Sequence, residues 1–481
     1  MTIHPKSSSM SALQCCPQII QGGMGAGVSG WPLARAVSEA GQLGVVAGTA
    51  LDVILSRRLQ LGDKGGHMRR ALAELPLPGV GERILERYFV SGGKAESEPF
   101  KAVPILQIPM AREQEELIIA GNFVEVYLAR GGHGGVVGIN YLEKIQAPTL
   151  PSLYGAMLAG VDYVLMGAGI PRAIPGILDS LAGGKAVEMR LDVRDSTGEF
   201  LASFDPAVFF SGELPPIERP KFLGIVASVT VASMLCRKAS GRVDGLIIEG
   251  PTAGGHNAPP RGKQQLDGAG EPVYSERDSA DISAIAALGV PFWLAGSYGS
   301  AERLREALEL GAAGVQVGTA FAYCEESGLA DDIKKRVLAM SRAGTISVFT
   351  DPNASPTGFP FKVLELEGTQ SDWELADARS RTCDLGYLRQ AFERPDGSLG
   401  WRCAGEPVKA YLKKGGTEED TTGKKCVCNG LLANVGLGQV RHGEHELPLI
   451  TSGNDVATIS RFPAKGANSY SARDVIDQLV N

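Results

Sequence analysis

Residues 19–41 read IIQGGMGAGVSGWPLARAVSEAG, an apolar strand-like run followed by glycines and then by a helix-like run. The glycines at 25–30 spell G-x-G-x-x-G, which is typical of a dinucleotide-binding Rossmann unit. A Rossmann unit also needs an acidic residue at the end of its second strand, where it binds the ribose hydroxyls. The next apolar run, LGVVAG, is followed instead by Thr-Ala. The opening glycines therefore predict a strand–turn–helix unit that lacks a dinucleotide site.

Seven further apolar runs share this pattern, because each ends near glycine and is followed by a helical pattern. The eight runs are 17–23, 43–48, 136–140, 161–169, 222–228, 243–250, 291–297 and 313–321. Their nearly continuous apolar character is typical of parallel strands that helices bury on both faces. Eight such strands alternating with helices predict an α/β fold, the (β/α)8 TIM barrel. A doubly wound open sheet is the alternative.

The spacing of the runs predicts a barrel over 17–330 with two insertions. The larger insertion follows the second strand, at about 49–135, and the other lies at about 190–220 and contains a short hairpin. Residues 331–481 are expected to form a C-terminal extension that packs on the barrel, beginning with a helix at 331–343. Within it, the charged run at 412–425 predicts an exposed loop.

The composition excludes several classes of protein. A net charge of −7 over 481 residues gives no indication of the basic surface that nucleic-acid-binding proteins carry. No apolar run approaches the roughly 18–20 residues that span a membrane, and the first residues carry no apolar leader. Eight irregularly spaced cysteines indicate reduced thiols and a cytoplasmic location. The chain also lacks the G-x-S-x-G, Walker A and H-E-x-x-H motifs of hydrolases and NTPases.

The run LIIEGPTAGGH at 246–256 carries the strongest signal for chemistry. A buried strand ends at Glu249, and Gly254 and Gly255 then precede His256 on the loop. In a TIM barrel, the loops at the carboxyl ends of the strands build the active site. Glycines let the backbone approach a flat ligand, and imidazole titrates near neutrality, which suits proton abstraction from a carbon acid. His256 is the candidate general base, and a hydrogen bond to a neighbouring loop is the structural alternative.

AGGH at 253–256, QGGMG at 21–25 and GAAGVQVGTAF at 311–321 together resemble the nitronate monooxygenase family, formerly the 2-nitropropane dioxygenases. Flavin-dependent enoyl-acyl carrier protein reductases are relatives of that family. The resemblance covers about 17–325 and implies a TIM barrel that holds FMN at the carboxyl ends of its strands, with His256 as the catalytic base. The candidate cofactor-binding residues are Gly22, Gly23, Met24, Asn140, Glu249, Gly254, Gly255, Gly296, Ser297, Gly318 and Thr319.

The resemblance also implies roles for these residues. Residues 22–24 match the segment that packs against the flavin ring, and Asn140 matches a polar contact to it. Two phosphate-binding turns match residues 296–297 and 318–319. Independently, both turns follow late apolar strands and precede helices, where backbone N–H groups attract anions. TIM barrels commonly bind phosphate on these last two loops. The alternative is that the glycines only make ordinary turns.

Three residues near the site depart from the pattern of the family. Thr252 replaces the acidic residue of EAGGH, Asn257 stands where a basic residue is frequent, and Gly23 stands where proline is common. The insertion at 49–135 and the long extension also exceed the compact form of the family. These differences agree with FMN binding but leave the substrate open.

The resemblance implies an FMN-dependent oxidoreductase that oxidises a nitronate or a nitroalkane-like carbon acid with O2. The first alternative is an enoyl-thioester reductase that uses NAD(P)H. The second is a non-catalytic barrel that acts as a partner-binding protein. The expected ligand is a small-molecule substrate, and a homodimer is one possible assembly.

The extension contains a candidate metal site. Its thiols and imidazoles are Cys383, Cys403, Cys426, Cys428, His442 and His445. Four thiols within 46 residues can bind Zn²⁺, but C-x-C lacks the usual two-residue spacer. Buried free thiols are therefore the preferred interpretation, and no metal ligand is assigned. Two other histidines are not expected to be catalytic, since His133 precedes a strand and His67 lies in a charged segment.

Overall fold

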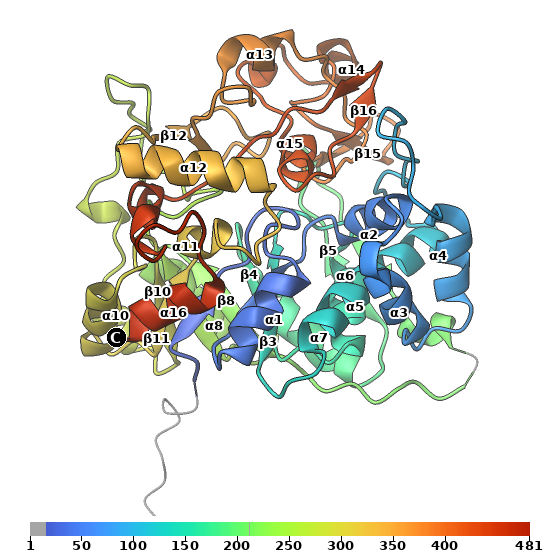
Figure 1. The fold of residues 1–481 in the computed structure, drawn as a ribbon. Coiled ribbons are helices and arrows are strands. Elements are labelled where there is room, and N and C mark those ends of the chain that lie inside the picture. The colour runs from blue at the N-terminus through green and yellow to red at the C-terminus, as the bar shows by residue number, and fades with distance from the viewer. Residues whose placement is uncertain (1–15, 211) are drawn as a thin grey trace, which may run out of the picture.

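A computed structural model describes residues 16–210 and 212–481. The first residues of the chain, for which the sequence predicts no apolar leader, lie largely outside these ranges. In this part of the chain, eight strands form one sheet in the order β1-β11-β10-β9-β8-β4-β3-β2, and all paired neighbours are parallel. The sheet closes between β1 and β2, where Leu43 N donates to Ile19 O (3.1 Å) and Gln21 N donates to Leu43 O (2.9 Å). The closed sheet with its surrounding helices (Figure 1) confirms the TIM barrel, and the open-sheet alternative is wrong.

The eight barrel strands coincide with the eight predicted apolar runs. They are β1 Ile19–Gln21, β2 Gly44–Ala47, β3 Val137–Leu142, β4 Tyr163–Gly167, β8 Lys221–Val226, β9 Gly245–Glu249, β10 Phe292–Ala295 and β11 Gly314–Val317. Ile20 and Ile247 belong to the apolar cluster formed by the strands alone, whereas Ile19 and Ile248 pack in a cluster with helical residues. Because alternate side chains enter two apolar layers, the strands have a continuous apolar sequence.

Helices follow or connect these strands. They are α1 Trp31–Glu39, α2 Leu51–Gln60, α3 His67–Ala73, α4 Val80–Tyr88, α5 Arg112–Arg130, α6 Thr149–Leu158, α7 Ile174–Ala182, α8 Val229–Lys238, α9 Ile282–Ala286, α10 Ala301–Glu309 and α11 Thr319–Ala322. Pro32 stands in the first turn of α1, where its missing N–H breaks no helical hydrogen bond. A side chain at Gly44 would overlap the carbonyl oxygen of Ala34, so glycine lets α1 lie directly on β2.

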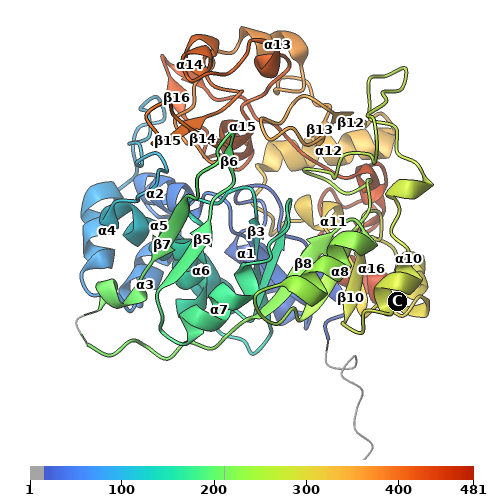
Figure 2. The ribbon, with the colours of Figure 1, turned by 180° about the vertical axis from the view of Figure 1, so that it is seen from behind.

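The two insertions have different structures. The first is helical and contains α2 to α5, of which α5 packs against α2 and α6. The second contains the predicted short hairpin, formed by antiparallel strands β5 (Val187–Arg190) and β7 (Leu201–Phe204). Between them, β6 (Val193–Arg194) pairs in parallel with β14 (Gln390–Glu393) from the C-terminal region. Figure 2 shows this excursion rising from the barrel to β14.

The chain beyond the barrel begins with α12 (Asp331–Ala343), which confirms the predicted helix. Residues 344–453, here called the cap, lie over the carboxyl ends of the barrel strands (Figure 1). Elements of the cap are β12 Val348–Asp351, β13 Phe361–Leu364, α13 Trp373–Ala378, β14, β15 Leu399–Arg402, α14 Val408–Lys413, α15 Val427–Ala433, β16 Val440–Arg441 and β17 Glu444–His445. The last helix, α16 (Ala472–Val480), returns to pack against α1 and α10.

Short 3-10 helices complete the secondary structure. They are η2 Lys64–Gly66, η3 Pro206–Phe209, η4 Glu276–Asp278, η5 Glu419–Thr421 and η6 Asn454–Arg461. The run predicted as an exposed loop, 412–425, is exposed in its middle but buries Thr421 and Lys425, so the prediction is wrong at these positions. The Lys425 ammonium donates to the carbonyl of Gln370 (2.7 Å). Among the helices of the described residues, none combines the length and the apolar character that crossing a membrane requires.

Candidate active site

A cavity of about 230 Å³ opens at the carboxyl ends of the barrel strands, beneath the cap. All twelve residues predicted from the sequence line it: Gly22, Gly23, Met24, Asn140, Glu249, Gly254, Gly255, His256, Gly296, Ser297, Gly318 and Thr319. They come from the loops or ends of five strands, β1, β3, β9, β10 and β11. The barrel therefore brings together residues that lie almost 300 positions apart in the chain.

The loop after β1 is ordered by a buried polar pair. Gln21 accepts a hydrogen bond from Val45 N (3.0 Å) and donates to the hydroxyl of Ser29 (2.9 Å). That hydroxyl donates to Gly22 O and accepts from Met24 N, both at 3.0 Å. This network holds backbone, rather than side chains, at the floor of the cavity.

Gly23 lies directly against Asn140 at the end of β3. A Cβ atom at Gly23 would overlap the side chain of Asn140, so only glycine allows this approach. The Asn140 amide donates only a long hydrogen bond to Tyr141 O (3.3 Å). Backbone and a polar amide therefore form one wall of the cavity, which suits the edge of a flat polar ring.

The turns after β10 and β11 form the opposite side of the cavity. Gly296 (φ +90°) and Ser297 (φ +60°) both have left-handed backbone conformations, which are uncommon for serine. Consecutive backbone N–H groups in such turns form concavities that bind anions. Thr319 accepts a hydrogen bond from Gly453 N (3.1 Å), and this contact joins the second turn to the cap.

His256 is enclosed between the barrel loop and the cap. Its Nε2 makes a 2.7 Å hydrogen bond with the hydroxyl of Ser355, and its ring centre lies 4.8 Å from that of Phe361. The backbone on either side is paired as well, since Asn257 N donates to Pro360 O and Lys362 N donates to Gly255 O. Burial, with a smaller contribution from Lys144, lowers the pKa of His256 to about 4. The imidazole is consequently neutral at pH 7.

The carboxyl group of Glu249 has no hydrogen-bond or ion-pair partner among the described residues, although the residue lies in the cavity wall. Burial raises the pKa of its carboxyl group from 4.5 to about 7. A second cavity, of about 280 Å³, adjoins the first, and Glu249 and His256 line both. Arg261 and Tyr274 line the second cavity only. The two titratable groups therefore stand at the boundary between the two spaces.

Sequence reasoning missed several residues of the cavity. Gln316 on β11 presents a buried side-chain oxygen that has no hydrogen-bond partner within the described chain. Its signal was a polar residue inside the apolar run AGVQVG. Further lining residues are Thr252, Phe361, Thr451, Ser452 and Gly453. Ser355 of the cap forms a hydrogen bond with His256 but is not among the lining residues. No local sequence pattern identifies the cap residues that line the cavity, because their position depends on how the C-terminal extension folds back over the barrel.

The other candidates lie elsewhere. His133 bonds the carbonyl of Ala129 (2.7 Å) and is not among the residues that line the cavity. His67 begins α3 and lies against the ring of Trp31 (4.9 Å between ring centres). In the described residues, no three His, Cys, Asp or Glu side chains form a group that could hold a metal ion. The four cysteines of the cap form no disulfide in the structure.

The fold and site define a (β/α)8 barrel with a glycine-built cavity and a histidine in its wall. Residues 205–355 match the family model for nitronate monooxygenase. A nitronate monooxygenase from Pseudomonas aeruginosa is 29% identical over 171 residues, which cover 33% of this chain and 45% of the relative. A (3aS,4S,5R,7aS)-5-hydroxy-7a-methyl-1-oxo-octahydro-1H-indene-4-carboxyl-CoA dehydrogenase from Mycobacterium tuberculosis is 28% identical over 143 residues, 30% of this chain and 36% of the relative.

These matches span less than half the length of the curated relatives. FabK from Thermotoga maritima is similar over 97% of this chain and 93% of that chain, at 17% identity and a TM-score of 0.49. This likeness adds no weight to the fold, which rests on the strand order and closure of the barrel. Residues 205–355 are similar to the nitronate monooxygenase family, as the motifs predicted.

Proposed function

We propose that this chain is an FMN-dependent oxidoreductase of nitronate monooxygenase type, which oxidises a nitronate or nitroalkane-like carbon acid with O2. The observation that carries the proposal is the convergence of the twelve predicted residues on one cavity. FMN would supply the electron-transfer chemistry when bound, while the protein supplies orientation and proton transfer.

The residues present fit FMN. Residues 22–24 and Asn140 would hold the ring, because their close approach leaves a wall free of intruding side chains. The unpartnered oxygen of Gln316 is available to a donor N–H of the ring system. The turns at 296–297 and 318–319 would hold the phosphate through backbone N–H groups.

His256 is the proposed general base. A base must be neutral before it accepts a proton, and the low pKa of this imidazole meets that condition at pH 7. An anionic nitronate bound beside His256 would stabilise the imidazolium and raise its pKa. An imidazole with a pKa of about 4 is a weak base toward a neutral nitroalkane. With a nitronate, which has already lost this proton, His256 would orient the anion instead. Ser355 and Phe361 orient the ring.

The second candidate is reduction of an enoyl thioester with NAD(P)H. One observation favours it: the M. tuberculosis relative is named as a dehydrogenase of a carboxyl-CoA compound. The second cavity would give such a substrate room beside His256, with Arg261 at its wall. In this reaction His256 would protonate or stabilise the enolate side of the product.

One pair of assays tests both candidates. The purified protein is first mixed with FMN, and its flavin absorbance is recorded after gel filtration. Aerobic turnover of a nitronate supports the first candidate, and anaerobic oxidation of NAD(P)H that depends on an enoyl thioester supports the second. A flavin-loaded protein inactive in both assays would contradict the two substrate classes. A protein that retains no flavin would contradict the proposal as a whole.

A further inference from the structure

Four cysteines of the cap converge on one small cavity. Cys383 follows α13, Cys403 follows β15, and Cys426 and Cys428 flank the start of α15. All four line a cavity of about 10 Å³, although the first and the last lie 45 positions apart in the chain. Cys428 also lines the candidate active-site cavity, so the thiol cluster and that cavity share a wall.

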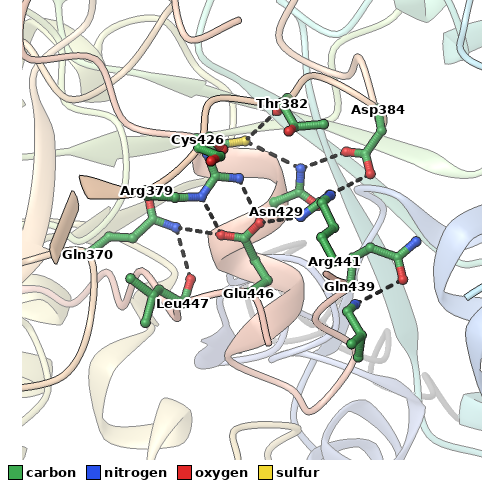
Figure 3. Close-up of polar contacts among 12 residues, drawn as sticks. Gln370, Arg379, Thr382, Asp384, Cys426, Asn429, Gln439, Arg441, Glu446 and Leu447 are labelled. Carbon is green, nitrogen blue, oxygen red and sulfur yellow. Dashed lines mark hydrogen bonds and ion pairs between the residues drawn. The ribbon is translucent and has the colours of Figure 1, made fainter. Parts of the chain in front are cut away.

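A buried ionic network fixes the segments that carry these thiols (Figure 3). Glu446 forms ion pairs with Arg379 (Nε–Oε1 2.5 Å) and Arg441 (Nη1–Oε2 2.7 Å). Arg441 also pairs with Asp384, and Asp384 accepts a hydrogen bond from Asn429 (2.8 Å). Asp384, the neighbour of Cys383 in the chain, is therefore hydrogen-bonded to α15, the helix that carries Cys428.

Cys426 is held by two of these neighbours. Its thiol donates to the carbonyl of Thr382 (3.7 Å), and its sulfur accepts a hydrogen bond from the Asn429 amide (3.4 Å). The thiol is thus directed toward the network drawn in Figure 3 and anchors the other side of Cys383. Cys426 has a structural role, which leaves Cys383 and Cys403 as a separate pair.

Cys383 and Cys403 line the same cavity, where their thiols share a hydrogen bond. This hydrogen bond lowers the pKa of Cys383, and Arg389 lowers it further, against burial and the carboxylates of Glu406 and Asp384. The same hydrogen bond and burial raise the pKa of Cys403. Cys383 is half-buried, whereas Cys403 is buried, so Cys383 is the more exposed of the two residues.

We propose that Cys383 and Cys403 form a thiol–disulfide exchange site for small disulfides, in which Cys383 is the attacking thiol and Cys403 the resolving thiol. The Cys383 thiolate attacks a disulfide RSSR, forms a mixed disulfide and releases one thiolate RS⁻. Cys403 then loses its proton and attacks the Cys383 sulfur, which forms the Cys383–Cys403 disulfide and releases the second RS⁻. The two protein thiols are oxidised, and RSSR is reduced to two thiols.

This site is independent of the flavin chemistry proposed above, since it uses no residue of the His256 loop. Its arrangement is typical of exchange pairs, which combine an accessible thiol beside a cation with a buried partner.

The test uses the full chain and glutathione disulfide as the probe. The reduced protein is incubated with the probe, its free thiols are alkylated, and its peptides are mapped by mass spectrometry. We expect a Cys383–Cys403 cross-link and a loss of two titratable thiols, both reversed by dithiothreitol. In Cys403→Ser, Cys383 should remain trapped as the mixed disulfide with glutathione. Cys383→Ser should abolish both products, and Cys236→Ser, altered on α8 outside the cap, should behave like the wild type.

Three outcomes would overturn the proposal. The first is a wild-type protein whose Cys383 and Cys403 stay alkylatable after treatment. The second is a cross-link between other cysteines, which would show that the pair seen in the structure is not the reactive one. The third is stoichiometric zinc in the purified protein that shields the thiols until it is chelated. Because peptide mapping of the wild type decides among these outcomes, the proposal does not depend on folding of the variants.

Discussion

The barrel and the cap contribute to the same cavity by different means. The barrel supplies backbone, because glycines at 22–23, 254–255, 296 and 318 line the space with few side chains. The cap supplies orienting groups, of which Ser355 and Phe361 hold the catalytic candidate His256. The barrel provides a surface that a ligand can approach closely, and the cap determines how the His256 side chain on that surface points.

The two regions are also stabilised differently. The barrel strands bury apolar side chains on both faces, a non-directional interaction that needs no specific partner. The cap has short strands and depends on directional contacts such as those of Glu446 with Arg379 and Arg441. A single polar substitution should therefore disturb the cap more than an equivalent one on the barrel surface.

The largest expected effect is on stability of the cap. Glu446→Ala removes a buried carboxylate from two partly exposed guanidinium groups, those of Arg379 and Arg441, which should lower the free energy of unfolding by about 3 kcal/mol. Glu39→Ala, which breaks the exposed pair with Arg35 on α1, is the matched control and should cost about 1 kcal/mol or less. Denaturant unfolding measures both. Equal effects would contradict the difference between the two regions.

The next effect is on catalysis. His256→Ala should retain FMN, because the glycine turns are unchanged, and should lose turnover on the order of 10²-fold or more. Steady-state kinetics and flavin absorbance measure the two properties separately. His133→Ala, altered in a loop histidine away from the cavity, should leave both unchanged. Wild-type turnover in the His256 variant would remove this residue from the mechanism.

A smaller effect is expected at the junction of cap and barrel. In Gly453→Ala, the new Cβ would lie 2.7 Å from Thr319 Oγ1 and 3.0 Å from Thr252 O. Such overpacking costs about 1–3 kcal/mol, so FMN binding should weaken roughly 5- to 150-fold. Gly134→Ala, whose Cβ would meet nothing within 4 Å, is the control. A fluorescence titration with FMN that gives equal affinities would show that the cap does not shape the phosphate side.

The smallest effect is a pH dependence carried by one group of the barrel. The folded pKa of Glu249, about 7, exceeds the ordinary value of 4.5, so the folded state retains the proton. Its contribution to stability is complete below about 4.5 and is lost as the pH rises through 7. Glu249→Gln should therefore remove part of the decrease in the free energy of unfolding between these values. Parallel pH profiles for wild type and variant would contradict a raised pKa.

Much of the barrel could be predicted from local sequence. Each apolar run and its following glycine is a continuous segment, so the type of element depends on neighbours in the chain. The loop 254–256 and the turns at 296–297 and 318–319 could be identified for the same reason. Gln316 was detectable in principle, as a polar residue within an apolar strand, but its unpartnered oxygen became evident only in the folded chain.

The cap could be predicted only in outline. The pairing of β6 with β14 joins residues about 200 positions apart, and neither of these short strands has a continuous apolar pattern of its own. Lys425 lies in a charged run that reads as exposed, yet its ammonium is buried against the carbonyl of Gln370. Such positions are decided by specific long-range partners, which composition and periodicity do not reveal.

The sequence by itself determined the barrel, its glycine turns and the histidine on the loop after β9, because hydrophobic periodicity and glycine conformation act over a few residues. Only the tertiary structure decided that the cap covers the cavity, that Ser355 bonds His256 and that Cys383 meets Cys403. Those contacts join segments some 20 to 100 residues apart. Their formation depends on the path of the whole chain, which is set by the sum of all buried interactions rather than by any one stretch.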